Sequence, residues 1–175
     1  MPCNQTLNGL VRDCSPSLGG IREVYLANKG DVQSVTISEG KVTAISMAAS
    51  AKFHKYAFSR ETGSLTSTYT IDPASGVRFV TSNLVLQFNR METAKRIEIT
   101  ALAQAELVGI VKDANGVYHY LGYDEALEAS AGDGQTGTAR SDANRYTITL
   151  QDISSEMPYE VLVGEGGVDL DTLVA

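Results

Sequence analysis

The residues that could do acid, base or nucleophilic chemistry are few and scattered along the chain. His54 and His119, the two histidines, both lie in stretches with a strand pattern, where no partner for nucleophilic catalysis stands at a useful spacing. Asp124 and Glu125 are adjacent, so in an extended chain they would point to opposite sides and would not form an acid and base pair. We therefore predict no catalytic residue and no enzymatic activity.

Metal-ligating residues are equally sparse. A zinc site built from Cys3 and Cys14 would need both histidines to return to the N-terminus, and the spacing matches no common zinc pattern. Residues 113–116 faintly resemble a calcium loop, but glycine stands fourth rather than sixth and the twelfth position, Asp124, is not glutamate. We predict no metal. In a reducing compartment we expect two free thiols, with a disulfide between them as the alternative.

Residues 132–137 have the glycine spacing of a dinucleotide-binding fingerprint. That motif needs a strand before it and a helix after it, so that pyrophosphate meets a helix N-terminus. Here residues 145–150 alternate as a strand does. The sequence therefore predicts a flexible inter-strand loop at 132–137 and no bound cofactor.

Composition limits the remaining classes. The chain has 175 residues, of which 43% are hydrophobic and 20% charged, as expected for one folded domain. A net charge of −7 with scattered basic residues argues against specific nucleic-acid binding. No apolar run is long enough to span a membrane, and the first residues lack the basic and apolar regions of a Sec-type signal, so we expect folding in a cytoplasm.

Periodicity predicts a mainly β fold, a β-sandwich or barrel with one α-helix, long hairpins and flexible terminal arms. Residues 113–116 join two strands as a hairpin turn containing Asn115 and Gly116. The helix is expected at about 91–106, capped by Asn89 with Glu92 three residues on. The other predicted strands are 21–27, 41–47, 53–59, 64–71, 77–88, 127–131, 144–151 and 159–163.

The strand predicted at 64–71 has two different faces. Leu65, Tyr69 and Ile71 share one face, while the opposite face carries small uncharged side chains: Ser64, Thr66, Thr68 and Thr70. In the next long strand Leu84, Leu86 and Phe88 share a face. We expect 53–59, 64–71 and 77–88 to be three long consecutive strands.

The chain divides into an N-terminal arm at 1–20, a single β-rich domain at 21–163 and a C-terminal tail at 164–175. Both ends lack periodic apolar patterning, so we expect them to be mobile in the isolated subunit and ordered in an assembly.

Four segments, residues 58–69, 88–99, 110–122 and 134–146, resemble structural virion proteins of tailed bacteriophages and prophages, most closely the major tail tube proteins. The resemblance covers roughly residues 53–150. It implies a β-sandwich or barrel with one helix, six copies in a ring whose inner strands close into a common barrel, and stacked rings that let DNA pass. It also implies location in the virion and partners among copies of the chain and other phage tail or head proteins. It carries over no catalytic residue.

Two alternatives stay open. A head decoration or fibre-base protein of the same kind of virus would also be acidic, β-rich and oligomeric. A β-sandwich binding module would use aromatic side chains as a stacking surface for sugars or bases, although core edges and subunit contacts explain these better: Tyr56, Tyr69, Tyr118, Tyr120, Tyr123, Tyr146 and Tyr159.

Overall fold

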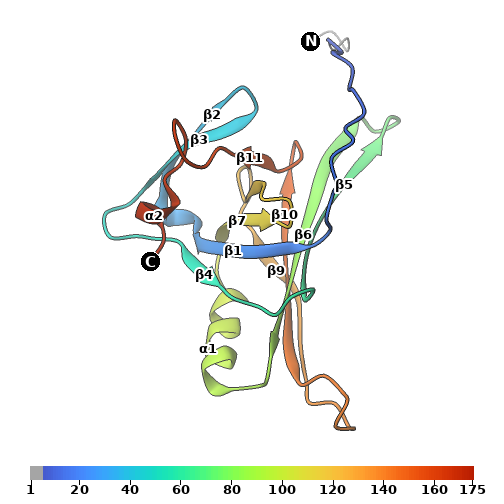
Figure 1. Ribbon diagram of the computed structural model, residues 1–175, viewed down its shortest axis with the longest axis vertical. Helices are drawn as coiled ribbons and strands as arrows, with labels where there is room; N and C mark the ends of the chain where they lie inside the picture. Colours follow the sequence, from blue (N-terminus) through green and yellow to red (C-terminus); the bar gives the residue numbers. More distant parts are fainter. Residues whose placement is uncertain (1–5) are drawn as a thin grey trace.

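The computed structural model describes residues 6–175, which form two β-sheets packed face to face with one main helix at their lower end (Figure 1). Half of the chain is strand and 10% is helical, which confirms the predicted mainly β class. Neither sheet closes into a barrel within the described residues, so of the two predicted architectures the sandwich is observed.

The larger sheet has seven strands in the order β2-β3-β11-β8-β7-β1-β4. Only the β11–β3 pair is parallel. The strands are β1 (Ile21–Asn28), β2 (Val32–Ser38), β3 (Lys41–Met47), β4 (His54–Tyr56), β7 (Leu107–Asp113), β8 (Tyr118–Leu121) and β11 (Tyr159–Val161). A short 3-10 helix, η1 (Lys29–Asp31), joins β1 to β2.

The smaller sheet has four strands in the order β5-β6-β10-β9, and every pair is antiparallel. Its strands run along the long axis of the molecule (Figure 1). They are β5 (Gly63–Asp72), β6 (Val77–Asn89), β10 (Arg145–Ser154) and β9 (Glu128–Gln135).

Two apolar clusters hold the fold together, one on each face of the seven-stranded sheet. Successive side chains of a strand point to opposite faces, and in β1 both sets are buried. Val24 and Leu26 enter the cluster between the two sheets, where Leu84, Leu86 and Leu150 of the smaller sheet meet them. The second cluster lies on the other face and includes Tyr25, Phe53, Ile110 and Tyr120.

The C-terminal segment differs from the predicted tail, because it packs against this second cluster. Val168 is buried, and the short helix α2 (Leu170–Leu173) contributes Leu170 and Leu173 to the packing. The backbone N–H of Phe53 donates to Leu173 O at 2.8 Å, and Ala175 N donates to Phe53 O at 2.9 Å. The segment lacks strand or long-helix periodicity because it places single apolar side chains, with a short helix between them, against the second cluster.

The predicted helix exists but is shorter, as α1 (Thr93–Leu102). Asn89 does not cap it; Glu92 occupies the N-cap without a side-chain cap bond. The Asn89 amide instead donates to Ser59 Oγ at 2.7 Å. Arg90, with φ of 65°, separates β6 from the helix, so the capping box could not form around Asn89.

Two strand predictions need correction. Residues 53–59 are not a long strand beside 64–71: only β4 is extended, and it pairs with β1 in the other sheet.

Residues 132–137 are not an inter-strand loop either, because β9 continues through Gln135 and pairs with β10. A Cβ at Gly134 would lie only 2.9 Å from the Tyr146 ring, so glycine at this position allows the ring to pack closely on the strand.

The hairpin predicted at residues 113–116 is confirmed. It joins β7 to β8, with Gly116 at φ of +88° and Asp113 N bonded to Val117 O at 2.9 Å. The Asp113 carboxylate also accepts the backbone N–H groups of Asn115 and Val117, at 2.8 and 2.9 Å.

Candidate assembly surface

The outward face of the four-stranded sheet is the most unusual surface of the molecule, because no layer within the described residues covers it. The register Thr66↔Asn83 and Gln151↔Asn83 places the outward side chains of the four strands in continuous rows. We call this surface the open face. It consists of Ser64, Thr66, Thr68, Thr70, Phe79, Thr81, Asn83, Val85, Gln87, Thr147, Thr149, Gln151, Ile153 and Ala131, with Arg145, Gln135, Glu128, Asp133, Asp72 and Val77 at its margins.

Hydroxyl and amide groups dominate the open face, as the sequence predicted for its β5 row. Gln151 Nε2 donates to Asn83 Oδ1 at 3.0 Å, and Arg145 donates to Gln87 Oε1 at 2.9 Å. These bonds tie β10 to β6 on the outer side. The result is a flat, hydrogen-bonding and nearly uncharged surface, quite unlike an apolar binding cleft.

The two edges of this sheet are open as well. β5 pairs only with β6, and β9 pairs only with β10, so within the described residues one backbone side of each edge strand has no ladder partner. The four strands alternate in direction. Consequently β9 of one copy and β5 of another, placed side by side with the same orientation, would meet antiparallel and continue the sheet.

The edge strands lack proline, lysine and short length as protection against such pairing, and β9 carries one β-bulge. Exposed edges are commonly shielded by proline, by lysine or by short length. Neither β5 nor β9 contains proline or lysine, and they are ten and eight residues long. One irregularity interrupts the β10–β9 register between Thr149 and Leu150.

The side chains considered for chemistry lie apart from one another. His54 is exposed on β4, and His119 Nε2 lies 3.4 Å from Asp113 Oδ2 beside the β7–β8 turn. Cys14 is exposed in the arm, while Cys3 falls outside the described residues. Within residues 6–175 no three His, Cys, Asp or Glu side chains stand close enough to hold a metal ion.

The tyrosines do not form one stacking surface. Tyr120 is buried in the second cluster, while Tyr56 packs against Phe88 with ring centroids 6.4 Å apart. Tyr123 and Tyr159 meet edge to face at 5.3 Å. Their separation gives the binding-module alternative no aromatic platform in the described part of the chain.

One buried ionisable residue escaped sequence reasoning. Asp152 on β10 is 3% exposed and lies on the inner face, opposite Ser82 of β6. Its Oδ2 accepts the Gly122 N–H at 2.7 Å, while Oδ1 has no hydrogen-bond partner. Burial raises the pKa of this carboxyl, although the Gly122 bond opposes that change. The signal was present, since the alternation of Ile148 and Leu150 places Asp152 on the apolar face.

The Asp152 carboxylate accepts the backbone N–H of Gly122, at a position that requires glycine. Gly122 has φ of +85°, and a Cβ added there would lie only 2.9 Å from Leu107 O. Asp152 holds its backbone N–H where β8 ends, so the carboxylate has a structural role at the contact between the two sheets.

None of the described helices has the length and apolar character required to cross a membrane. Comparisons with protein-family models, with curated proteins and with solved structures found no match to this chain.

Proposed function

We propose that this chain is a structural, self-assembling subunit of a bacteriophage tail, in which copies join through their four-stranded sheets into rings that stack as a tube. The observation that carries the proposal is the pair of edge strands, β5 and β9, that have no second ladder partner within the described residues, on a sheet whose outer face is also uncovered. The sequence resemblance to tail tube proteins supports it from an independent direction.

The two edges favour a ring over a symmetric pair. Pairing β9 of one copy with β5 of the next uses two different surfaces, and such a head-to-tail contact repeats until it closes on itself. A closed ring leaves no free edge in the four-stranded sheet, which removes the aggregation hazard that β5 and β9 carry in each monomer. The ring expected from the resemblance contains six copies.

In such a ring the open face would line the lumen, because the seven-stranded sheet and α1 cover the opposite face. Its interior rows are uncharged, with hydroxyl and amide groups in the majority and Phe79, Val85 and Ile153 among them, and the whole chain carries a net charge of −7. A duplex passing through would meet few cations that could bind its phosphates. We therefore propose DNA passage without specific DNA binding.

Electron microscopy of concentrated purified protein, together with its mass in solution, tests the proposal. We expect rings and rods built from them. A molecule that stays monomeric at every concentration, or that forms closed trimers, would contradict the tube and favour a decoration protein.

Proline substitutions locate the contact. Successive backbone N–H groups of a strand point to its two opposite edges. One of the two variants Thr68→Pro and Tyr69→Pro therefore removes a donor directed at β6, and the other removes a donor directed at the unpaired edge. We expect one of the two to remain a folded monomer without rings, with Thr68→Val as the control that keeps the donor. Normal rods from both proline variants would place the interface elsewhere.

A further inference from the structure

A groove lies between α1 and β4, on the side of the molecule away from the open face. Its volume is about 420 Å³. Apolar side chains form most of its lining, and charged side chains stand at its rim; the main contributors are Tyr56, Phe88, Ala94, Ile99 and Leu102, with Lys55, Lys95 and Glu98. The groove could receive a short apolar segment that carries charges of both signs beside it.

The N-terminal arm supplies a segment of that kind. Leu7, Leu10 and Val11 are at least 90% exposed. Large aliphatic side chains left this exposed in one short segment are typical of a surface that becomes covered on association. Arg12 and Asp13 follow directly, so the arm carries one charge of each sign next to its apolar residues.

The arm leaves the domain at a fixed point. Leu18 N donates to Asn115 Oδ1 at 2.8 Å, and Asn115 Nδ2 donates back to Leu18 O at 3.1 Å. Ala114 N also donates to Gly20 O at 3.0 Å. Among the described residues, none from 6 to 17 makes a hydrogen bond to the domain. The turn between β7 and β8 therefore holds the base of the arm, while Leu7, Leu10 and Val11 stay exposed among the described residues.

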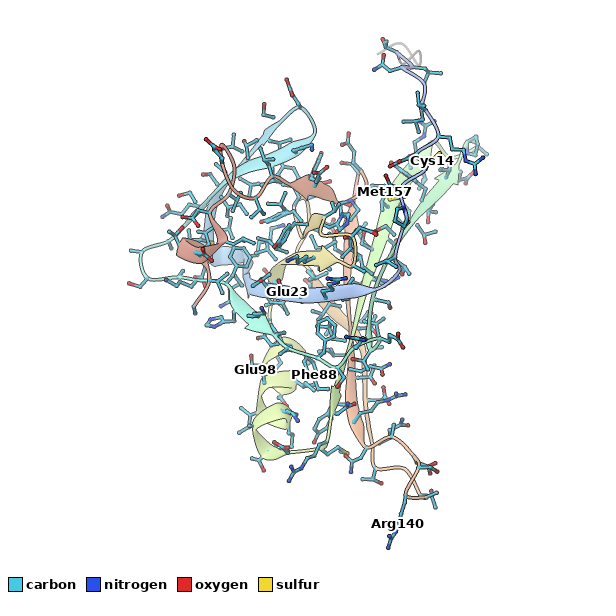
Figure 2. All side chains as sticks on the ribbon, in the orientation of Figure 1. Cys14, Glu23, Phe88, Glu98, Arg140 and Met157 are labelled. Atoms are coloured by element: carbon cyan, nitrogen blue, oxygen red, sulfur yellow. The ribbon has the colours of Figure 1, made fainter. Side chains whose placement is uncertain are left out.

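The arm and the groove lie toward opposite ends of the molecule. Figure 2 shows Cys14 near the upper end of the long axis, whereas Glu98 and Phe88 lie in the lower half. The strands of the four-stranded sheet run along this axis, so in a stacked tube the arm points toward the neighbouring ring (Figure 1). Twelve extended residues, 6–17, span about 40 Å.

We infer that the arm of one copy docks through Leu7, Leu10 and Val11 into the α1–β4 groove of a copy in the adjacent ring. The inference rests on the proposed function, because it needs stacked rings. The contact joins two different surfaces that lie at different heights along the long axis of the subunit, which is the geometry that propagates a filament. Arg12 can then meet Glu98, and Asp13 can meet Lys55 or Lys95.

Disulfide cross-linking tests the contact. In a chain carrying Cys3→Ser and Cys14→Ser, we introduce Leu10→Cys together with Ala94→Cys in the groove. Mild oxidation of rods should give a ladder of linked chains on a non-reducing gel. The control pairs Leu10→Cys with Ala101→Cys, an exposed α1 position outside the groove lining, and should give at least tenfold less ladder. Equal ladders from the two pairs, or a disulfide closed within one chain, would overturn the inference.

A second set of variants separates this contact from ring formation. Leu10→Asp with Val11→Asp, and separately Ala94→Trp, should leave rings intact and strongly reduce rods, while Ala101→Trp should assemble normally. Circular dichroism checks that each variant is folded. If the unmodified protein forms neither rings nor rods, the proposed function fails. If rods form equally well from every variant, the proposed function survives and the arm contact is wrong.

Discussion

The two sheets of this domain differ in how much of their surface is buried. The central strands β1 and β7 of the seven-stranded sheet are buried on both faces, one against the smaller sheet and one in the second cluster with the C-terminal segment, while its edge strands β2 and β4 are largely exposed. The four-stranded sheet buries one face and leaves the other face and both edges uncovered within the described residues. The comparison indicates that the larger sheet provides stability, whereas the smaller sheet keeps its bonding capacity for other copies.

Matched phenylalanine substitutions test this division, and they should show its largest effect. Phe53 is fully buried in the second cluster, so Phe53→Ala should lower the free energy of unfolding by about 3–5 kcal/mol. Phe79 lies half-buried on the open face, and Phe79→Ala should cost about 1 kcal/mol or less in the monomer. Urea unfolding measures both values. Similar losses would show that the open face is part of the stabilising core.

The two termini give the next largest contrast. Ending the chain after Gly166 removes Val168, Leu170 and Leu173 from the second cluster, and should cost at least about 2 kcal/mol. None of residues 6–17 belongs to either apolar cluster, so deleting residues 1–17 should leave unfolding nearly unchanged. Hydrogen exchange should likewise be slow around 168–174 in the isolated subunit and fast in 6–17. Fast exchange at both ends would restore the interpretation of 164–175 as a free tail.

Asp152 provides a pH-dependent test of the contact between the sheets. Burial raises its pKa in the folded protein, so the folded state holds the proton more tightly than the unfolded chain does. The stabilisation that comes from this tighter proton binding is fully present below the pKa of the unfolded chain, about 3.9 for aspartate. It is lost as the pH rises through the pKa of the folded protein. Relative to Asp152→Asn, the wild type should therefore lose stability as the pH is raised across this window, which urea unfolding at a series of pH values measures. A difference that does not change with pH would contradict the burial of this carboxyl.

The smallest expected effect concerns DNA. Because the open face has few cations and the chain is acidic, the protein should bind duplex DNA no more tightly than a neutral control at moderate salt. Retention on a DNA column at low salt, lost by substituting Arg145, would show that the open face binds phosphate.

Sequence patterns predicted the parts of the fold that depend on local rules. The alternation of Leu84 and Leu86, and of the threonines in β5, placed their faces correctly because period-two patterning is local. The hairpin at Asn115 and Gly116 was predictable for the same reason. Sequence alone could not show that β4 joins the other sheet, since long-range pairing leaves no local signal.

The candidate surface was predictable only in part. The small uncharged row from Ser64 to Thr70 marked one strand of the open face. The rest of the open face, on β6, β10 and β9, depends on the register between these strands. The same holds for the unpaired edge of β9, where the glycines had predicted a loop. The packing of Val168 depends on the second cluster, which distant segments of the chain form together. These features appear only when distant segments are placed side by side.

The central claim is that β5 of one copy pairs with β9 of the next. A cryo-electron microscopy reconstruction of assembled rods, at a resolution that separates strands, tests it most directly. The account predicts one continuous antiparallel sheet around the lumen, with β5–β9 ladders between copies and Ser64, Thr66, Thr68 and Thr70 facing inward. Rods joined through the seven-stranded sheet, or with the open face turned outward, would contradict it.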